Sequence, residues 1–279
     1  MTVYLPDTLS GALSVLQENP AADILAGGTD LMTELNYRHR AMGSVLCLRN
    51  LSELGQWDSD GQSLTIGANV KYSDIMTSDI ARLAPALAQA ARTVGSPQIR
   101  NTGTLGGNLA TASPAGDTLP VLYALEANVN LRSTQGDRTV PVQDFITGVK
   151  RNALRPGELI VSVTMPVAKG RQEFLKIGKR NAMVIAVTNL ALVVNEETRK
   201  LTCALGAVGP SIIRCTDAED YINGQIDWSS GVLPDRSAVS RFAELCGAAA
   251  RPIDDHRSTA NYRRHAVAIL AKRALDRVV

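Results

Sequence analysis

The chain has 279 residues, of which 45% are apolar, so it can bury a core and extensive disorder is not expected. Its 29 basic and 27 acidic residues leave a formal net charge of +2, and aromatic residues make up only 4%. These values argue against a nucleic-acid-binding face, a polybasic membrane surface and a base-stacking platform. The N-terminal segment lacks the pattern of a secretory signal, and no apolar run approaches the roughly 20 residues of a membrane span, so we expect a cytoplasmic protein.

The first part of the chain predicts helices and strands in a mixed α+β order. Short apolar or alternating runs predict strands at 24–26, 45–48, 63–68, 128–132 and 139–142. Amphipathic patterns predict helices at 9–16, 30–40, 80–94 and 118–126. The apolar stripe that includes Ile80, Leu87 and Val94 indicates one continuous helix at 80–94, which ends at the Gly-Ser-Pro that follows it.

A charged stretch that begins at Lys169 indicates a boundary between two domains. A strand is predicted before it at 159–165. Strands are predicted beyond it at 174–177, 184–194 and 202–207, although the first part of 184–194 fits a helix equally well. Helices are predicted at 239–250 and 259–278. The acidic pair Asp254-Asp255 is expected to face water, as adjacent carboxylates in a loop usually do.

Two glycine-rich turns, far apart in the sequence, are the strongest candidates for a binding site. The first is L-A-G-G-T-D at 25–30, and the second lies within S-P-Q-I-R-N-T-G-T-L-G-G-N at 96–108. Glycine lets backbone N–H groups approach an anion without a Cβ in the way. The pair therefore suggests a ligand with a polyphosphate body that is held from two sides, although the first turn alone is also compatible with an ordinary strand–helix connection.

Neither turn matches the two most familiar nucleotide-binding motifs. No Lys-Ser or Lys-Thr follows the glycines, as a P-loop requires. The spacing of Gly103, Gly106 and Gly107 does not fit G-x-G-x-x-G, so a Rossmann fingerprint is also absent. A phosphate site here would belong to another fold.

Polar side chains near the second turn add candidate ligand contacts. Thr104 offers a hydroxyl, Gly106 and Gly107 offer backbone N–H groups, and Asn108 can both donate and accept. The carboxylate of Asp117 is suited to a ribose diol, but the residue is equally suited to cap the helix predicted to follow it.

The cysteines predict no metal or cluster site. Cys47, Cys203, Cys215 and Cys246 contain no C-x-x-C pair, so neither a zinc ribbon nor a ferredoxin-type cluster is predicted. We expect reduced thiols in a cytosolic protein.

Three motifs together resemble those of a known family. A-G-G-T-D at 26–30, I-R-N-T-G-T-L-G-G-N at 99–108 and S-P-A-G-D at 113–117 are similar to the motifs of the FAD-binding medium subunit of the molybdenum hydroxylases, the xanthine dehydrogenase family. The resemblance extends over nearly the whole chain, and the second motif is the most specific. It implies an α+β fold, in which a p-cresol methylhydroxylase-type FAD-binding domain of two α/β lobes precedes a C-terminal domain of antiparallel sheet and helices.

The resemblance also implies domain limits and site residues. The FAD-binding domain would span 1–168, with lobes at about 1–55 and 56–168, and the C-terminal domain 169–279. The FAD pyrophosphate and its neighbours would be held by Leu25, Ala26, Gly27, Gly28, Thr29, Asp30, Leu31, Thr104, Leu105, Gly106, Gly107 and Asn108. Asp117 would contact the ribose–adenine half, and Ile160 the cofactor by backbone or side chain. Lys176 would lie near the flavin, the alternative being an ordinary solvated lysine on a strand.

By the same resemblance, the protein is an electron-transfer subunit with no catalytic residue or metal ligand of its own. A small partner chain would carry [2Fe–2S] clusters, and a large partner chain a molybdenum–pterin centre that hydroxylates an N-heterocycle or aldehyde. The flavin would pass electrons to NAD⁺, a quinone or another acceptor. Met183-Val184-Ile185 stands where many relatives have an acidic residue, so an NAD⁺ contact is not carried over to this segment. A self-contained flavin oxidoreductase and a non-redox nucleotide-binding scaffold are the alternatives.

Overall fold

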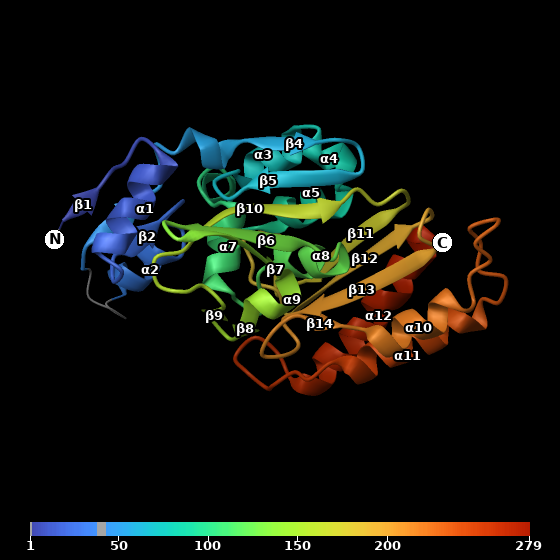
Figure 1. Cartoon of the computed structure of the whole chain (residues 1–279). Coiled ribbons are helices and arrows are strands. Elements are labelled where there is room, and N and C mark those ends of the chain that lie inside the picture. Colours follow the sequence, from blue (N-terminus) through green and yellow to red (C-terminus); the bar gives the residue numbers. More distant parts are fainter. Residues whose placement is uncertain (1, 38–42) are drawn as a thin grey trace.

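The computed structural model describes residues 2–37 and 43–279, and its elements form a row of three sheet-based layers (Figure 1). At the N-terminal end, a three-stranded parallel sheet has the order β1-β3-β2, with strands β1 (Val3–Tyr4), β2 (Asp23–Leu25) and β3 (Val45–Cys47). Helix α1 (Leu9–Glu18) starts at Thr8, whose hydroxyl accepts a hydrogen bond from the N–H of Gly11. It packs its leucines against this sheet to form a small core of its own.

The second layer is an antiparallel five-stranded sheet covered by short helices. Its order is β4-β5-β10-β6-β7, formed by β4 (Trp57–Ser59), β5 (Ser63–Gly67), β6 (Asn128–Ser133), β7 (Gly136–Pro141) and β10 (Leu159–Pro166). The helices of this region are η1 (Ser52–Gly55), α3 (Tyr72–Thr77), α4 (Ile80–Leu83), α5 (Pro85–Thr93), α6 (Pro97–Arg100), α7 (Leu105–Thr111), α8 (Thr118–Ala124) and α9 (Val142–Phe145). A small hairpin, β8 (Ile146–Gly148) and β9 (Arg151–Asn152), follows them.

The third layer is an antiparallel four-stranded sheet between two sets of helices. It contains β11 (Gln172–Ile177), β12 (Thr188–Asn195), β13 (Lys200–Gly206) and β14 (Ile213–Arg214) in sequence order. Because α5 and α8 pack on one face and α10 (Thr216–Asn223), α11 (Ser237–Ala249) and α12 (Ala260–Val278) cover the other, β12 is buried on both sides (Figure 1). The predicted α+β fold class is confirmed.

Three element predictions differ from the structure. The predicted helix at 80–94 is two helices, because Pro85 lacks an N–H and forces Ala84 out of the helical region (φ −135°, ψ 69°). The helix predicted at 30–40 is α2 (Leu31–Asn36), and positions 38–42 lie outside the described residues. The strand predicted at 184–194 begins only at Thr188, and the preceding residues form a loop rather than a helix.

Asp255 is also placed differently from the expectation. Its carboxylate accepts hydrogen bonds from the N–H groups of Arg257 and Ser258 and from the guanidinium of Arg263 instead of facing water alone. Within the described residues, no helix is long and apolar enough to cross a membrane.

Candidate cofactor site

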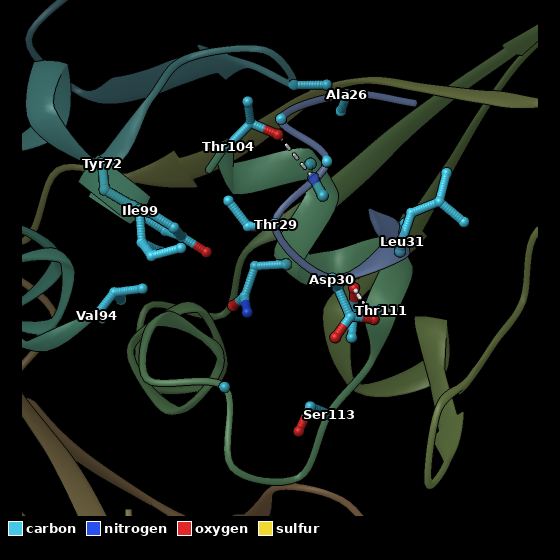
Figure 2. A pocket seen from close by; sticks show the side chains of 18 of the residues that line it. Ala26, Thr29, Asp30, Leu31, Tyr72, Val94, Ile99, Thr104, Thr111 and Ser113 are labelled. Atoms are coloured by element: carbon cyan, nitrogen blue, oxygen red, sulfur yellow. Dashed lines mark hydrogen bonds between the residues drawn. The ribbon is translucent and has the colours of Figure 1, made fainter. Parts of the chain in front are cut away.

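A pocket of about 420 Å³ lies where the first two layers meet, within the range of roughly 300–1,000 Å³ typical of small-molecule sites. Both glycine turns line it. In Figure 2, Ala26, Thr29, Asp30 and Leu31 of the first turn lie on one side, and Tyr72, Val94 and Ile99 lie on the other. The pocket wall is completed by Asp117, Leu159, Ile160, Val184 and Ile185, among others.

The first glycine turn offers several unused hydrogen-bond donors to this pocket. The backbone N–H groups of Gly27, Gly28, Thr29 and Asp30 donate to no atom of residues 2–37 and 43–279. Gly28 has φ +72°, a conformation that glycine adopts without strain. Because unpaired N–H groups at a partly buried turn require an acceptor, this row fits an anion such as a pyrophosphate.

Gly27 lets the first turn touch the second. A Cβ added at Gly27 would lie 2.0 Å from the carbonyl oxygen of Thr102 and 2.9 Å from the Cα of Gly103. The two backbones therefore meet at this point, and no larger residue fits between them. This contact holds the first turn in place across the boundary between the first two layers.

The N–H groups of the second glycine turn donate to other atoms of the protein, contrary to the expectation that Gly106 and Gly107 offer free N–H groups. The N–H of Gly106 donates to the carbonyl of Ala68 (2.9 Å), and that of Gly107 donates to the hydroxyl of Thr104 (3.0 Å; Figure 2). A Cβ at Gly106 would lie 2.6 Å from the Cβ of Ala68. These glycines permit close packing and a capped start of α7, so the turn shapes the pocket but leaves few backbone donors for a ligand.

Asn108 supplies a side-chain donor at the second turn. Its Oδ1 accepts a hydrogen bond from the hydroxyl of Thr118 at 2.6 Å, which fixes the orientation of the amide. Its Nδ2 has no protein acceptor within the described part of the chain and lies at the pocket wall. Asn108 can therefore donate to a ligand.

Asp117 lies at the centre of a buried polar network. Its Oδ2 is 2.5 Å from Nζ of Lys176 and accepts from the hydroxyl of Thr93 at 3.0 Å, while its Oδ1 accepts from Nδ2 of Asn189 at 2.9 Å. Its side chain makes no capping bond to α8, so the capping interpretation is wrong. Burial raises the pKa of this carboxyl group, and the lysine together with the hydrogen bonds opposes that rise.

Lys176 is a buried partner of Asp117, and the interpretation as a solvated lysine is wrong. Its side chain is 7% exposed, and its ammonium group also donates to the carbonyl of Thr93. Lys176 does not line the pocket. Asp117 and Lys176 form one ion pair, so they lie at the same place beside the pocket and do not contact opposite halves of a dinucleotide. The pair also links β11 of the third layer to the pocket wall.

Tyr72 is a pocket residue that the sequence analysis did not single out. It is buried, and its ring lies against Gly103, where an added Cβ would be 2.8 Å from a ring carbon. Burial, and then the negative charge of Asp117, raise the pKa of its hydroxyl. Only a contact between distant segments brings it here, so no local pattern identifies it.

Most of the residues assigned by resemblance come together in the pocket. The wall includes Ala26, Gly27, Gly28, Thr29, Asp30, Leu31, Thr104, Gly106, Gly107, Asn108, Asp117 and Ile160. Leu25, Leu105 and Lys176 are outside it: Leu25 ends β2, and Leu105 is fully buried in the core. Ile160 lies beside a register shift in the pairing of β10 with β6.

Comparison with known protein families identifies the class of protein that has this fold and this pocket. Residues 1–168 match the family model of the FAD binding domain in molybdopterin dehydrogenase, and residues 173–278 match the CO dehydrogenase flavoprotein C-terminal domain. The chain therefore belongs to the family of medium, FAD-binding subunits of the molybdenum hydroxylases, which are oxidoreductases, and the predicted family is confirmed.

Individual relatives match over nearly their whole length. The glyceraldehyde dehydrogenase medium chain of Sulfolobus acidocaldarius is 32% identical over 98% of this chain and 96% of its own. The xanthine dehydrogenase FAD-binding subunit of Escherichia coli O157:H7 is 28% identical over 98% and 94%. Quinoline 2-oxidoreductase of Pseudomonas putida 86 superposes with a TM-score of 0.91 at 26% identity, over 100% of this chain and 96% of the other.

Proposed function

We propose that this chain carries FAD in a heteromeric molybdenum hydroxylase and transfers electrons between a partner chain and an external acceptor. The row of unused N–H groups at the first glycine turn is the observation that carries the proposal. It faces a pocket of suitable size in a chain of this family. Bound FAD would supply the redox chemistry, because a flavin exchanges electrons both singly and in pairs.

The first turn would bind the pyrophosphate. The N–H groups of Gly27, Gly28, Thr29 and Asp30 are the donors without a protein acceptor in the described chain, so they can hydrogen-bond to phosphate oxygens at no cost to the fold. Asn108 would add its amide donor from the facing wall. The remaining assigned residues of the second turn would pack closely against the neighbouring backbone and so give the pocket its shape.

Asp117 would bind the cofactor through one remaining acceptor position. A carboxylate oxygen accepts about two hydrogen bonds, and Oδ1 accepts one from Asn189. A hydroxyl group of the cofactor can donate the second hydrogen bond to Oδ1. Lys176 would act on the cofactor through Asp117, as a positioning residue that holds this carboxyl group in place and opposes the rise of its pKa on burial.

The partner chains and the acceptor are part of the same proposal. The described part of the chain has no cysteine set with the spacing of an iron–sulfur cluster, so [2Fe–2S] clusters and a molybdenum–pterin centre would be on a small and a large partner chain. The substrate would be an N-heterocycle or an aldehyde. NAD⁺, a quinone or another acceptor would receive the electrons. We retain 1–55, 56–168 and 169–279 as the proposed lobes and domain.

The test is to purify the chain with an affinity tag from cells that produce it together with its genomic neighbours. We expect a complex that contains iron, molybdenum and flavin, in which substrate bleaches the flavin absorbance. The isolated chain should show flavin absorbance but no bleaching by the same substrate, because the chain that oxidises the substrate is missing.

Two results would contradict the proposal. Bleaching of the isolated, metal-free chain by the same organic substrate in the absence of partners would favour a self-contained flavin oxidoreductase. A pure chain without flavin absorbance, even after incubation with FAD, would favour a nucleotide-binding scaffold.

A further inference from the structure

Three of the four cysteines, scattered in the sequence, meet in the core of the third layer. Cys203 lies in β13, Cys215 directly precedes α10, and Cys246 lies in α11. Their sulfur atoms are all within 4.8 Å of one another, and each residue is at most 1% exposed. The three cysteines do not have C-x-x-C spacing in the sequence, because they come together only through the packing of one strand and two helices.

The separation of the sulfur atoms suits one small metal ion. A metal–thiolate bond is about 2.3 Å long, so three sulfurs placed symmetrically around one ion lie about 4.0 Å from one another. The three sulfur atoms here all lie within 4.8 Å of one another, so each must move by less than about 1 Å to hold one ion.

The backbone around two of the cysteines is fixed by a buried ion pair. Glu219 accepts hydrogen bonds from the N–H of Cys203 (2.8 Å) and from both Nε and Nη2 of Arg214 (2.8 and 2.7 Å). The N–H of Glu219 donates to the backbone carbonyl of Cys215, and the N–H of Cys215 donates to the backbone carbonyl of Cys203. Such outer contacts keep ligands in position, as they do around known metal sites.

The same contacts restrict which ion fits. Glu219, the carboxylate beside the cluster, has its oxygens engaged by Arg214 and by the N–H of Cys203, and within the described residues no other His, Cys, Asp or Glu joins the three cysteines as a fourth ligand. A structural zinc site needs four ligands, whereas soft thiolates alone satisfy monovalent copper. From this geometry we infer that Cys203, Cys215 and Cys246 form a three-coordinate site for a soft cation of the cuprous type, which binds the three sulfurs as thiolates and releases their protons to the solvent.

The test uses the full, FAD-loaded chain, reduced and handled without oxygen. Cu(I) is offered as its bicinchoninate complex, and the chelator absorbance reports how much copper the protein removes. We expect the wild-type chain to remove one equivalent. Cys203→Ser and Cys246→Ala should bind more than tenfold more weakly, because even outer-shell losses at metal sites cost about 10–100-fold. Cys47→Ser is the matched control, since Cys47 is also buried but lies in β3, and it should behave as wild type.

X-ray absorption of the copper-loaded wild-type chain gives a second measurement that needs no variant. It should show sulfur neighbours only. The inference is wrong if the reduced, folded wild-type chain removes no Cu(I), or if it binds Zn(II) and not Cu(I). It is also wrong if Cys47→Ser loses binding as Cys203→Ser does, or if nitrogen or oxygen neighbours dominate the absorption spectrum.

Discussion

The two glycine turns look alike in sequence and differ in what they do. At the first turn, the N–H groups of Gly27 to Asp30 find no acceptor in the described chain. At the second, the N–H groups of Leu105, Gly106, Gly107 and Asn108 all donate to protein atoms. A glycine motif can therefore serve a ligand directly, by exposing donors, or indirectly, by letting backbones pack closely enough to shape the pocket. The two uses are distinguished by whether the backbone N–H groups of the turn have acceptors in the protein.

The largest expected effect comes from the ion pair behind the second turn. Lys176→Met removes the cation that pairs with the buried carboxyl group of Asp117, which should lower the free energy of unfolding by about 3–5 kcal/mol. The double variant with Asp117→Asn should lose less, because no lone charge remains. Lys200→Met is the control: its pair with Glu126 is exposed and contributes about 1 kcal/mol at most. Urea unfolding measures all three, and equal losses for Lys176→Met and Lys200→Met would show that the buried pair has no structural role.

Gly27→Ala tests the contact between the turns. The new Cβ would lie 2.0 Å from the carbonyl oxygen of Thr102, and forcing the backbones apart should cost about 1–3 kcal/mol. Because the displaced turn carries the open donors, FAD affinity should fall tenfold or more in a fluorescence titration. Gly55→Ala, where the added Cβ meets no atom within 4 Å, should retain the wild-type affinity. An unchanged affinity for Gly27→Ala would remove the first turn from the site.

Thr104→Ala tests the supporting role of the second turn. The hydroxyl of Thr104 caps α7 by accepting from Gly107, so its loss should cost about 1 kcal/mol of stability. Thr104→Ser should restore it, since the capping oxygen remains. FAD affinity should change less than it does in Gly27→Ala. If Thr104→Ala instead abolishes FAD binding in a chain of unchanged stability, the hydroxyl contacts the ligand and the contrast between the turns is wrong.

The last comparison concerns a less buried ion pair, whose contribution to stability depends on pH. Burial acts to raise the pKa of Asp255, but hydrogen bonds from Arg257, Arg263 and Ser258 lower it to about 2. A pKa below the unfolded value of about 3.9 stabilises the fold above that pH, and this contribution is lost as the pH falls towards 2. Asp255→Asn should therefore melt earlier than wild type at pH 7, by a margin that shrinks between about pH 4 and pH 2.

The matched control for this titration is Asp79→Asn. The carboxylate of Asp79 is 71% exposed and 3.9 Å from Arg82, so its removal should leave the melting temperature almost unchanged at every pH. A pH-independent difference between wild type and Asp255→Asn would mean that the carboxylate charge does not contribute.

The sequence was sufficient for the family, the α+β fold and the two glycine turns of the pocket wall, because glycine motifs and apolar periodicity are local signals. The break at Pro85 was also a local signal, but the apolar stripe on both sides of it obscured the break. The interaction of Asp117 with Lys176 could not be predicted, because it depends on how β11 packs against α5 and how α8 packs against β12. The convergence of Cys203 with Cys246 has the same origin: residues without a motif are brought together only by tertiary topology.

Hydrogen–deuterium exchange of the backbone tests the contrast between the turns most directly. Amides without a protein acceptor exchange fast, and a ligand that accepts from them slows the exchange. The account predicts that residues 27–30 exchange fast in the FAD-free chain and become protected when FAD is added, whereas residues 105–108 are protected in both states. Protection gained at 105–108 with no change at 27–30 would contradict it.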